Sequence, residues 1–236
     1  MSRAAGVLRL EITTQWRYRF THAAVISGVL WLALLLPLPG ELRSVAEPYV
    51  VLGDLTIVGF FFIAASVFFE KGERTLHALV ASPVRFAEYL SAKLVTLTAL
   101  SALLAVFVAT VTHGADYHLP ALLLGAVFGT PLLLLTSFVT SLPFPSVSDW
   151  FMPSVVPLTL LNLPILHYSG LVESSWFYLV PTQGPLLMLG AAFHQKSPEL
   201  WQVGYAVVYP TLFALGLFWL ARRVFDRYVV ARTGGA

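Results

Sequence analysis

Residues 70–88 read EKGERTLHALVASPVRFAE and form the one long polar interruption in an otherwise hydrophobic chain. Before it runs Tyr49–Phe69, whose only charged residue is Asp54, and after it runs Leu94–Thr112, which carries no charge. Each flank is long enough to cross a hydrocarbon core about 30 Å thick, because a helix rises about 1.5 Å per residue. Charged side chains are costly inside hydrocarbon, so the polar stretch is predicted to lie at a membrane surface between two spans.

The polar stretch also has a pattern of its own. Leu76, Leu79 and Val80 recur at helical spacing, which predicts a short surface helix. Ser82 is a capping residue type, and Pro83 suits the first position of a new helix. We therefore expect a second helix to begin at Pro83 and to continue into the next span.

The composition indicates the same class of protein. The 236 residues are 58% hydrophobic and only 11% charged, with a mean hydropathy of +0.80. These values are typical of helical membrane proteins, so we predict an all-α fold, one domain over residues 1–236 and the lipid bilayer as a partner. The formal net charge of +2 gives no reason to expect a nucleic-acid partner, and the absence of cysteine excludes disulfides and thiolate metal sites.

The N-terminal segment, residues 1–21, precedes the first apolar run. Apolar residues recur at every fourth position with arginines between them: Leu8, Ile12, Trp16 and Phe20, against Arg9, Arg17 and Arg19. This spacing predicts an amphipathic helix that lies in the membrane interface. A basic flank that only sets the orientation of the chain is the alternative, and the two interpretations are compatible.

Six spans are expected: Ala23–Pro39, Tyr49–Phe69, Leu94–Thr112, Pro120–Leu142, Phe151–Tyr168 and Val203–Ala221. Glu41–Glu47 is predicted to be a short outer loop. A further uncharged segment, Trp176–Phe193, is also long enough to cross, but Pro181, Gly184 and Pro185 interrupt it. We therefore expect residues 173–200 to form an outer re-entrant hairpin of two short helices.

Basic residues set the predicted orientation. With six spans, the N-terminal segment, the polar stretch and the C-terminal tail share one side of the membrane, and only Arg43 and Lys196 of the 14 Lys and Arg residues fall on the other. The positive-inside rule makes the basic side cytoplasmic. A seventh span would place the tail Arg222–Arg232 outside. We expect a multi-pass protein of the cell (inner, cytoplasmic) membrane with both termini in the cytoplasm.

The residues of the polar stretch resemble the first cytoplasmic loop of ABC-2-type transporter permeases. The resemblance is carried by Glu70, Gly72, Glu73, Thr75-Leu76, Leu79, Ser82-Pro83, Glu88-Tyr89-Leu90 and Lys93. One position departs from the pattern, because Arg74 stands where the family usually has glycine and the glycine is found at Gly72. In size and hydropathy layout the whole chain is similar to the small drug-export permeases of that family, including those of fluoroquinolone efflux.

The resemblance implies a coupling helix that docks on a separate ATP-hydrolysing subunit. The predicted contact residues, within a coupling hairpin over residues 70–92, are Glu70, Gly72, Glu73, Thr75, Leu76, Leu79, Val80 and Pro83. It further implies that ATP and Mg²⁺ are bound by the partner, that a second permease completes a homodimer or heterodimer, and that the complex exports a hydrophobic or amphiphilic substrate such as a drug, a lipid or a lipid-linked molecule.

The sequence offers little for bond-breaking chemistry. It lacks a Gly-rich phosphate loop ending in Gly-Lys-Ser/Thr, a His-Glu-x-x-His pair and a Gly-x-Ser-x-Gly elbow, and its six histidines are scattered. We therefore assign no catalytic residue, no metal ligand and no cofactor to this chain, and we do not expect it to be an enzyme by itself.

Asp54 is the one carboxylate clearly inside a predicted span. It is interpreted either as a rim carboxylate that faces outer water or as part of a transport path or dimer seam. Phe61 and Phe62 are interpreted either as lining that path or as packing toward lipid. Two other classes stay open: an ion-coupled secondary transporter that uses Asp54, and a polytopic membrane enzyme, against which the isolation of Asp54 argues.

Overall fold

The computed structural model describes residues 3–82 and 84–231, and throughout these residues the regular elements are helices. In chain order they are α1 (Arg3–Arg17), α2 (Phe20–Leu35), α3 (Gly40–Thr56), the π-helical turn η1 (Ile57–Phe62), α4 (Ile63–Gly72), α5 (Thr75–Ala81), α6 (Phe86–His113), α7 (Leu119–Ser141), α8 (Val147–Asn162), α9 (Pro164–Tyr168), the 3₁₀ turn η2 (Ser175–Leu179), α10 (Gln183–Ala192), α11 (Leu200–Phe225) and the π-helical turn η3 (Asp226–Val230).

Five helical stretches in the described part of the chain are long and apolar enough to cross a membrane: Gly40–Gly72, Phe86–His113, Leu119–Ser141, Val147–Tyr168 and Leu200–Val230. A sixth is added if α1 and α2, which meet at an angle of 61°, are counted as one bent span. The predicted helical membrane protein is confirmed at this level, with five or six candidate spans.

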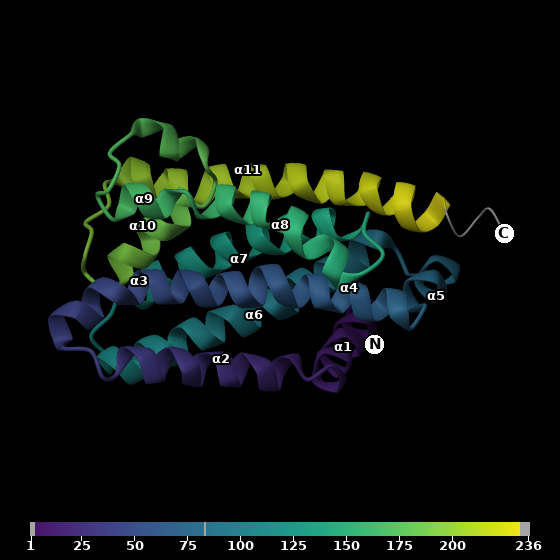
Figure 1. Cartoon of the computed structure of the whole chain (residues 1–236), viewed down its shortest axis with the longest axis horizontal. Coiled ribbons are helices and arrows are strands. Elements are labelled where there is room, and N and C mark those ends of the chain that lie inside the picture. The colour runs from purple at the N-terminus through teal and green to yellow at the C-terminus, as the bar shows by residue number, and fades with distance from the viewer. Residues whose placement is uncertain (1–2, 83, 232–236) are drawn as a thin grey trace.

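The long helices lie side by side along one bundle (Figure 1). The central helix is α7, which contacts α6, α10, α11 and η1. Helices α1 and α5 lie at one end, together with the C-terminal end of α11, whose η3 turn contacts α5. Helices α9 and α10 lie toward the other end. We call these the hairpin end and the opposite end.

The helix that precedes the hairpin is continuous from Gly40 to Gly72. The prediction of an outer loop over Glu41–Glu47 is therefore wrong, because helix α3 already begins at Gly40 behind the turn at Pro39. The helix changes to π geometry over η1, where the Ser137 hydroxyl of α7 donates a hydrogen bond of 2.5 Å to the Phe60 carbonyl. That bond supplies a partner for a backbone group that the π turn leaves less well paired.

Helix α2 ends at Leu35, so the predicted first span, Ala23–Pro39, is placed too far toward the C-terminus. The guanidinium of Arg43 explains the earlier end, because it donates hydrogen bonds to the carbonyls of Leu35, Leu36 and Leu38 at 3.2, 2.9 and 3.1 Å. The basic side chain thus caps the C-terminus of α2, where free carbonyls and the helix dipole favour a positive charge.

The hairpin contains the expected short helix, but the next helix begins later than predicted. Ser82 ends α5, since its hydroxyl donates to the Leu79 carbonyl at 2.8 Å. Helix α6 begins at Phe86, where the Glu88 carboxylate accepts a hydrogen bond of 2.9 Å from the Arg85 amide. This cap fixes the helix start, so the predicted start at Pro83 is wrong, and Pro83 itself lies outside the described residues.

Residues 173–200 are broken into two short helices, as predicted, with η2 at the surface and α10 completely buried. Helix α10 packs against α3, α7 and α11. Its approach to α11 is close, because a Cβ on Gly184 would lie 2.6 Å from the Cα of Ala206. The position of this pair relative to the membrane remains a prediction.

Candidate functional site

The hairpin end gathers most of the residues predicted to contact an ATP-hydrolysing partner. Gly72, Glu73 and Thr75 are exposed there, whereas Glu70 is buried. Leu76 is only 2% exposed and belongs to the apolar core of this end of the bundle. Leu76 thus anchors α5 to its own chain, and its predicted contact with a partner stays a prediction.

The other two apolar residues of the predicted surface helix, Leu79 and Val80, also face the core of their own chain. Leu79 and Val80 are partly buried and pack against the same core. Two small residues of α5, Ala78 and Ala81, are exposed instead. The coupling role of the hairpin stays a prediction, but the surface that would carry it is flatter and less apolar than the sequence pattern indicated.

Behind the hairpin lies a buried ion cluster centred on Lys93, which is 0% exposed. Its ammonium contacts the Glu70 carboxylate at 2.5 Å and the Glu11 carboxylate at 3.1 and 3.2 Å, and it donates to the Ser66 hydroxyl at 2.7 Å. Glu11 comes from α1, Glu70 from α4 and Lys93 from α6. We call these residues, with Gln15 and Tyr89, the Lys93 cluster.

Gln15 and Tyr89 complete the hydrogen bonding of the two carboxylates. The Tyr89 hydroxyl donates to Glu70 at 2.5 Å, and the Gln15 amide donates to Glu11 at 3.1 Å. A buried charge is tolerated when it is paired and its remaining lone pairs accept hydrogen bonds, and removing one partner leaves a large unfavourable term. The Lys93 cluster therefore fastens α1, the end of α4 and the start of α6 into one unit.

A second basic residue ties the hairpin to the turn between α7 and α8. The Lys71 ammonium donates to the carbonyls of Ser141, Leu142 and Phe144 at 3.0, 2.8 and 2.7 Å. These carbonyls lie at the C-terminus of α7, where a positive charge is favoured. The start of the hairpin is thus held by α7 as well as by α1 and α6.

An exposed pair connects the hairpin with α1 on the solvent side. The Arg17 guanidinium contacts Glu73 at 2.5 Å, and the Tyr18 hydroxyl donates to the same carboxylate oxygen at 2.8 Å. Hydrogen bonds from Tyr18 and Arg17 lower the pKa of Glu73 below the ordinary value for a glutamate. Both partners of this ion pair are solvent-exposed, so it orients the hairpin more than it stabilises the fold.

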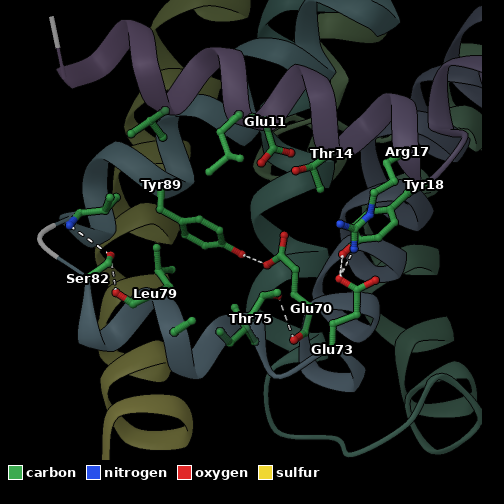
Figure 2. A pocket seen from close by; sticks show the side chains of 15 residues that line it. Glu11, Thr14, Arg17, Tyr18, Glu70, Glu73, Thr75, Leu79, Ser82 and Tyr89 are labelled. Carbon is green, nitrogen blue, oxygen red and sulfur yellow. Dashed lines mark hydrogen bonds and ion pairs between the residues drawn. The ribbon is translucent and has the colours of Figure 1, made fainter.

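A cavity of about 380 Å³ lies between α1 and the hairpin. Figure 2 shows the Tyr89 hydroxyl directed at Glu70 between α1 on one side and the hairpin on the other. The cavity is lined by Val7, Leu10, Glu11, Thr14, Arg17, Tyr18, Glu70, Glu73, Thr75, Leu76, Ala78, Leu79, Ser82, Val84 and Tyr89. Part of the predicted coupling hairpin and part of the Lys93 cluster thus line one cavity. A single sequence could not locate this cavity, because its walls come from distant segments of the chain.

The residues predicted for a substrate path lie deeper in the bundle. Asp54 is 2% exposed and its Oδ1 accepts a hydrogen bond of 2.8 Å from Ser27, while Oδ2 has no partner among the described residues. Its interpretation as a rim carboxylate that faces water is therefore wrong. Phe62 is buried and stacks on Phe20 with ring centroids 5.3 Å apart, so it does not face lipid. Phe61 packs edge-on against Phe60. A role of Asp54, Phe61 or Phe62 in transport stays a prediction.

Comparison with known proteins gives a consistent assignment. A family model described as the fluoroquinolones export permease protein family matches residues 2–233. Two proteins named as fluoroquinolones export permease proteins, from the Mycobacterium tuberculosis strains CDC 1551 / Oshkosh and H37Rv, are each 57% identical over 235 residues, which covers 99% of this chain and 99% of theirs. No solved structure matches the chain. The chain belongs to the fluoroquinolones export permease protein family, which confirms the resemblance to drug-export permeases.

Proposed function

We propose that this chain is the permease subunit of an ATP-driven exporter of the ABC-2 type. It carries amphiphilic drugs, with fluoroquinolones as the first candidates, out of the cytoplasm. ATP and Mg²⁺ are bound and ATP is hydrolysed on a separate subunit. The drug class is taken from the names of the relatives, which are described as fluoroquinolones export permeases.

The Lys93 cluster is the observation that carries this proposal. A nucleotide-driven subunit can move a membrane bundle only through an element that is firmly connected to it. Here a surface helix, α5, follows the end of α4, where the Glu70 carboxylate is bonded to Lys93 of α6 in a buried pair. Through Glu11 the same ammonium also holds α1. A displacement of the hairpin is thereby passed to α1, α4 and α6 together.

The proposed docking surface is the exposed outer side of the hairpin. It comprises Arg74, Ala81 and Arg85, which are solvent-exposed and do not line the cavity. Small side chains permit close approach of a partner, and the flanking charges provide a polar rim of the kind found around interface centres. Leu76, Leu79 and Val80 hold this surface in place from below.

Orientation and assembly complete the proposal. The end of the bundle that carries α1, α5 and the last turns of α11 faces the cytoplasm, in line with the distribution of arginine and lysine. One bundle offers one wall of a path, so a second permease, identical or related, supplies the other wall. The substrate passes outward between the two when the bundles exchange between inward and outward states.

Copurification with the ATP-hydrolysing subunit tests the docking surface. We expect Ala81→Asp to abolish copurification, because an unpaired charge is placed at the contact, while membrane insertion of the permease is unchanged. Leu171→Asp is the matched control, since Leu171 is 76% exposed and follows α9 toward the opposite end. Retention of the partner and of full drug export in Ala81→Asp would mean that the hairpin is only a surface loop.

A second candidate, an ion-coupled secondary transporter, is favoured by one observation. Asp54 is buried with one carboxylate oxygen lacking a partner among the described residues, which is an arrangement suited to binding a proton or a small cation. Drug export in proteoliposomes separates the two candidates. Export that requires ATP and the partner subunit, and continues without an ion gradient, supports the ABC-2 proposal, whereas export driven by the gradient alone supports the second.

A further inference from the structure

We propose that the cavity between α1 and the hairpin is a binding site for an amphiphilic monocation, meaning a single positive charge joined to a bulky apolar or aromatic body. The proposal rests on the proposed export function in taking this cation as a substrate before transport. The assignment itself comes from the walls, the charges and the access of the cavity.

The walls fit an apolar body. The cavity is about 380 Å³ in volume, which lies within the range of roughly 300–1,000 Å³ typical of sites for small molecules. Apolar side chains line it from three directions: Val7 and Leu10 from α1, Leu76 and Leu79 from α5, and Val84 from the connection to α6. A drug-sized aromatic or aliphatic group is buried well by such walls.

The charges fit a single positive charge. Three carboxylates line the cavity, those of Glu11, Glu70 and Glu73, and one cation, Arg17, lines it with them. Lys93 lies directly behind Glu11 and Glu70 and is shared by both. With these two cations counted against three carboxylates, one negative charge is left over. A bound monocation neutralises it, whereas an anion would add to it in a site partly screened from water.

Ring faces and an open carboxylate oxygen mark where the cation sits. Both hydrogen bonds to Glu73 fall on Oε2, so Oε1 is free to accept another among the described contacts. The rings of Tyr18 and Tyr89 line the same space, and each already attracts a cation: Arg17 lies 5.4 Å from the Tyr18 centroid and Lys93 5.0 Å from that of Tyr89. Aromatic faces near a carboxylate favour ammonium and phosphonium ions.

Access to the cavity suits a ligand dissolved in the membrane surface. Leu10 forms part of its wall and is 65% exposed, and on the same helix Ile12 and Trp16 are 59% and 61% exposed. An amphipathic helix with an outward apolar face lies in the headgroup region, where amphiphilic cations accumulate. Such a ligand reaches the cavity past α1 without leaving the interface.

The test uses two ions of the same shape and opposite charge. The full-length chain in lipid nanodiscs is titrated with tetraphenylphosphonium and with tetraphenylborate, with empty nanodiscs as the blank for partition into lipid. We expect saturable binding of the phosphonium only. Glu73→Gln, which keeps an acceptor for Tyr18 and Arg17 but removes the charge, should weaken phosphonium binding by about 3- to 10-fold. Glu173→Gln removes an exposed carboxylate after α9 and should leave it unchanged.

Each outcome decides the proposal. Three results would overturn it: no saturable phosphonium binding, equal binding of both ions, or an unchanged affinity in Glu73→Gln. If the cavity holds a lipid chain, we expect equal binding of both ions that does not change in Glu73→Gln. Export is measured separately with the ATP-hydrolysing subunit. Drug export without phosphonium binding leaves the proposed function intact and rejects this site, whereas phosphonium binding without ATP-dependent export keeps the site and rejects the proposed function.

Discussion

Different contacts stand out at the two ends of the bundle, in addition to the apolar packing that both ends share. The hairpin end is fastened by charge: Lys93 pairs with Glu11 and Glu70, and Lys71 caps the carbonyls at the end of α7. The opposite end is fastened by close packing, because α10 approaches α11 so closely that a Cβ on Gly184 has no room. The buried ion pairs join three separate helices through long side chains, whereas close packing fixes the distance between two helix axes.

This difference indicates which end of the bundle is rigid and which end can move. Helix α10 is wholly buried against α7 and α11, so the opposite end forms a rigid scaffold. The hairpin end contains a 7-residue helix that is too short to be stable by itself and depends on its apolar contact through Leu76 and on the polar ties next to it. Substitutions that break the ion pairs should therefore destabilise the hairpin end first. A larger side chain at Gly184 should destabilise the packing at the opposite end.

The largest effect is expected for Lys93→Met. The substitution leaves Glu11 and Glu70 buried without their cation, which for a broken buried pair costs about 3–5 kcal/mol of stability. We expect a strong drop in yield of folded protein and in the melting temperature followed by tryptophan fluorescence. Lys196→Met, at an exposed position before α11, is the control and should change stability little.

A compensating variant distinguishes charge from packing at the same site. The triple substitution Lys93→Met, Glu11→Gln and Glu70→Gln removes all three charges while keeping similar volumes, so it should recover part of the lost stability. A single Lys93→Met variant as stable as the unmodified chain would show that the Lys93 cluster does not fasten the hairpin end.

A smaller effect is expected for Gly184→Ala at the opposite end. The added Cβ would lie 2.6 Å from the Cα of Ala206, a backbone atom that cannot move aside locally. Overpacking of this kind destabilises by about 1–3 kcal/mol. Gly204→Ala on α11 is the matched control, because its Cβ meets nothing within 4 Å and alanine favours the helix by up to about 1 kcal/mol. Equal melting temperatures for the two variants would contradict close packing as the force at this end.

Asp54 lies between the two ends, and we expect its substitution to change stability less than the substitutions at either end. Asp54→Asn keeps the acceptor for the Ser27 hydroxyl and removes a buried charge whose Oδ2 has no partner among the described residues. We therefore expect stability to change by less than about 1 kcal/mol, or to rise slightly. Ser27→Ala removes the donor and should destabilise by about 1–3 kcal/mol. A large loss in Asp54→Asn would mean that the charge itself holds α2 against α3.

Sequence patterns predict the features of this fold that depend on local composition. The apolar run Pro120–Leu142 matches α7, Leu119–Ser141, within one residue at each end, because this span is an uncharged apolar run bounded by turns. The polar stretch likewise predicts the hairpin. Pro181 predicts the break that separates η2 from α10, whereas Gly184 and Pro185 lie inside the first turn of α10.

Features that depend on distant partners could not be predicted. Glu11 and Lys93 are 82 positions apart, so neither residue indicates the other in a single sequence. A weak signal existed in α1, where Glu11 and Gln15 stand four apart and so share one face of the helix. That polar face turns inward because its partner is there, while Ile12 and Trp16 point outward. The burial of Asp54 and of Leu76 is likewise set by neighbouring helices and not by local pattern.

The smallest effect on stability is expected for the exposed ion pair between Arg17 of α1 and Glu73 of the hairpin. Tyr18 and Arg17 lower the pKa of Glu73, so the bonds that they donate are present above the ordinary glutamate pKa and are lost only as the pH falls through the lower value in the folded protein. We expect no resolvable change in melting temperature when this exposed pair breaks. The hairpin should nevertheless move further from α1, because the remaining buried ion pair, between Glu70 and Lys93, lies before α5 and does not hold α5 itself.

Spin labels measure that loosening directly, since the chain has no native cysteine. Labels at Thr13→Cys on α1 and Ala81→Cys on α5 occupy exposed positions on either side of the cavity. Their distance distribution should stay narrow from neutral pH down to the ordinary glutamate pKa of about 4.3 and broaden only below it. In the Glu73→Gln background the neutral amide does not titrate, so the width should lose its dependence on pH. If the distribution already broadens about one pH unit above the ordinary glutamate pKa, a group other than Glu73 controls the position of the hairpin.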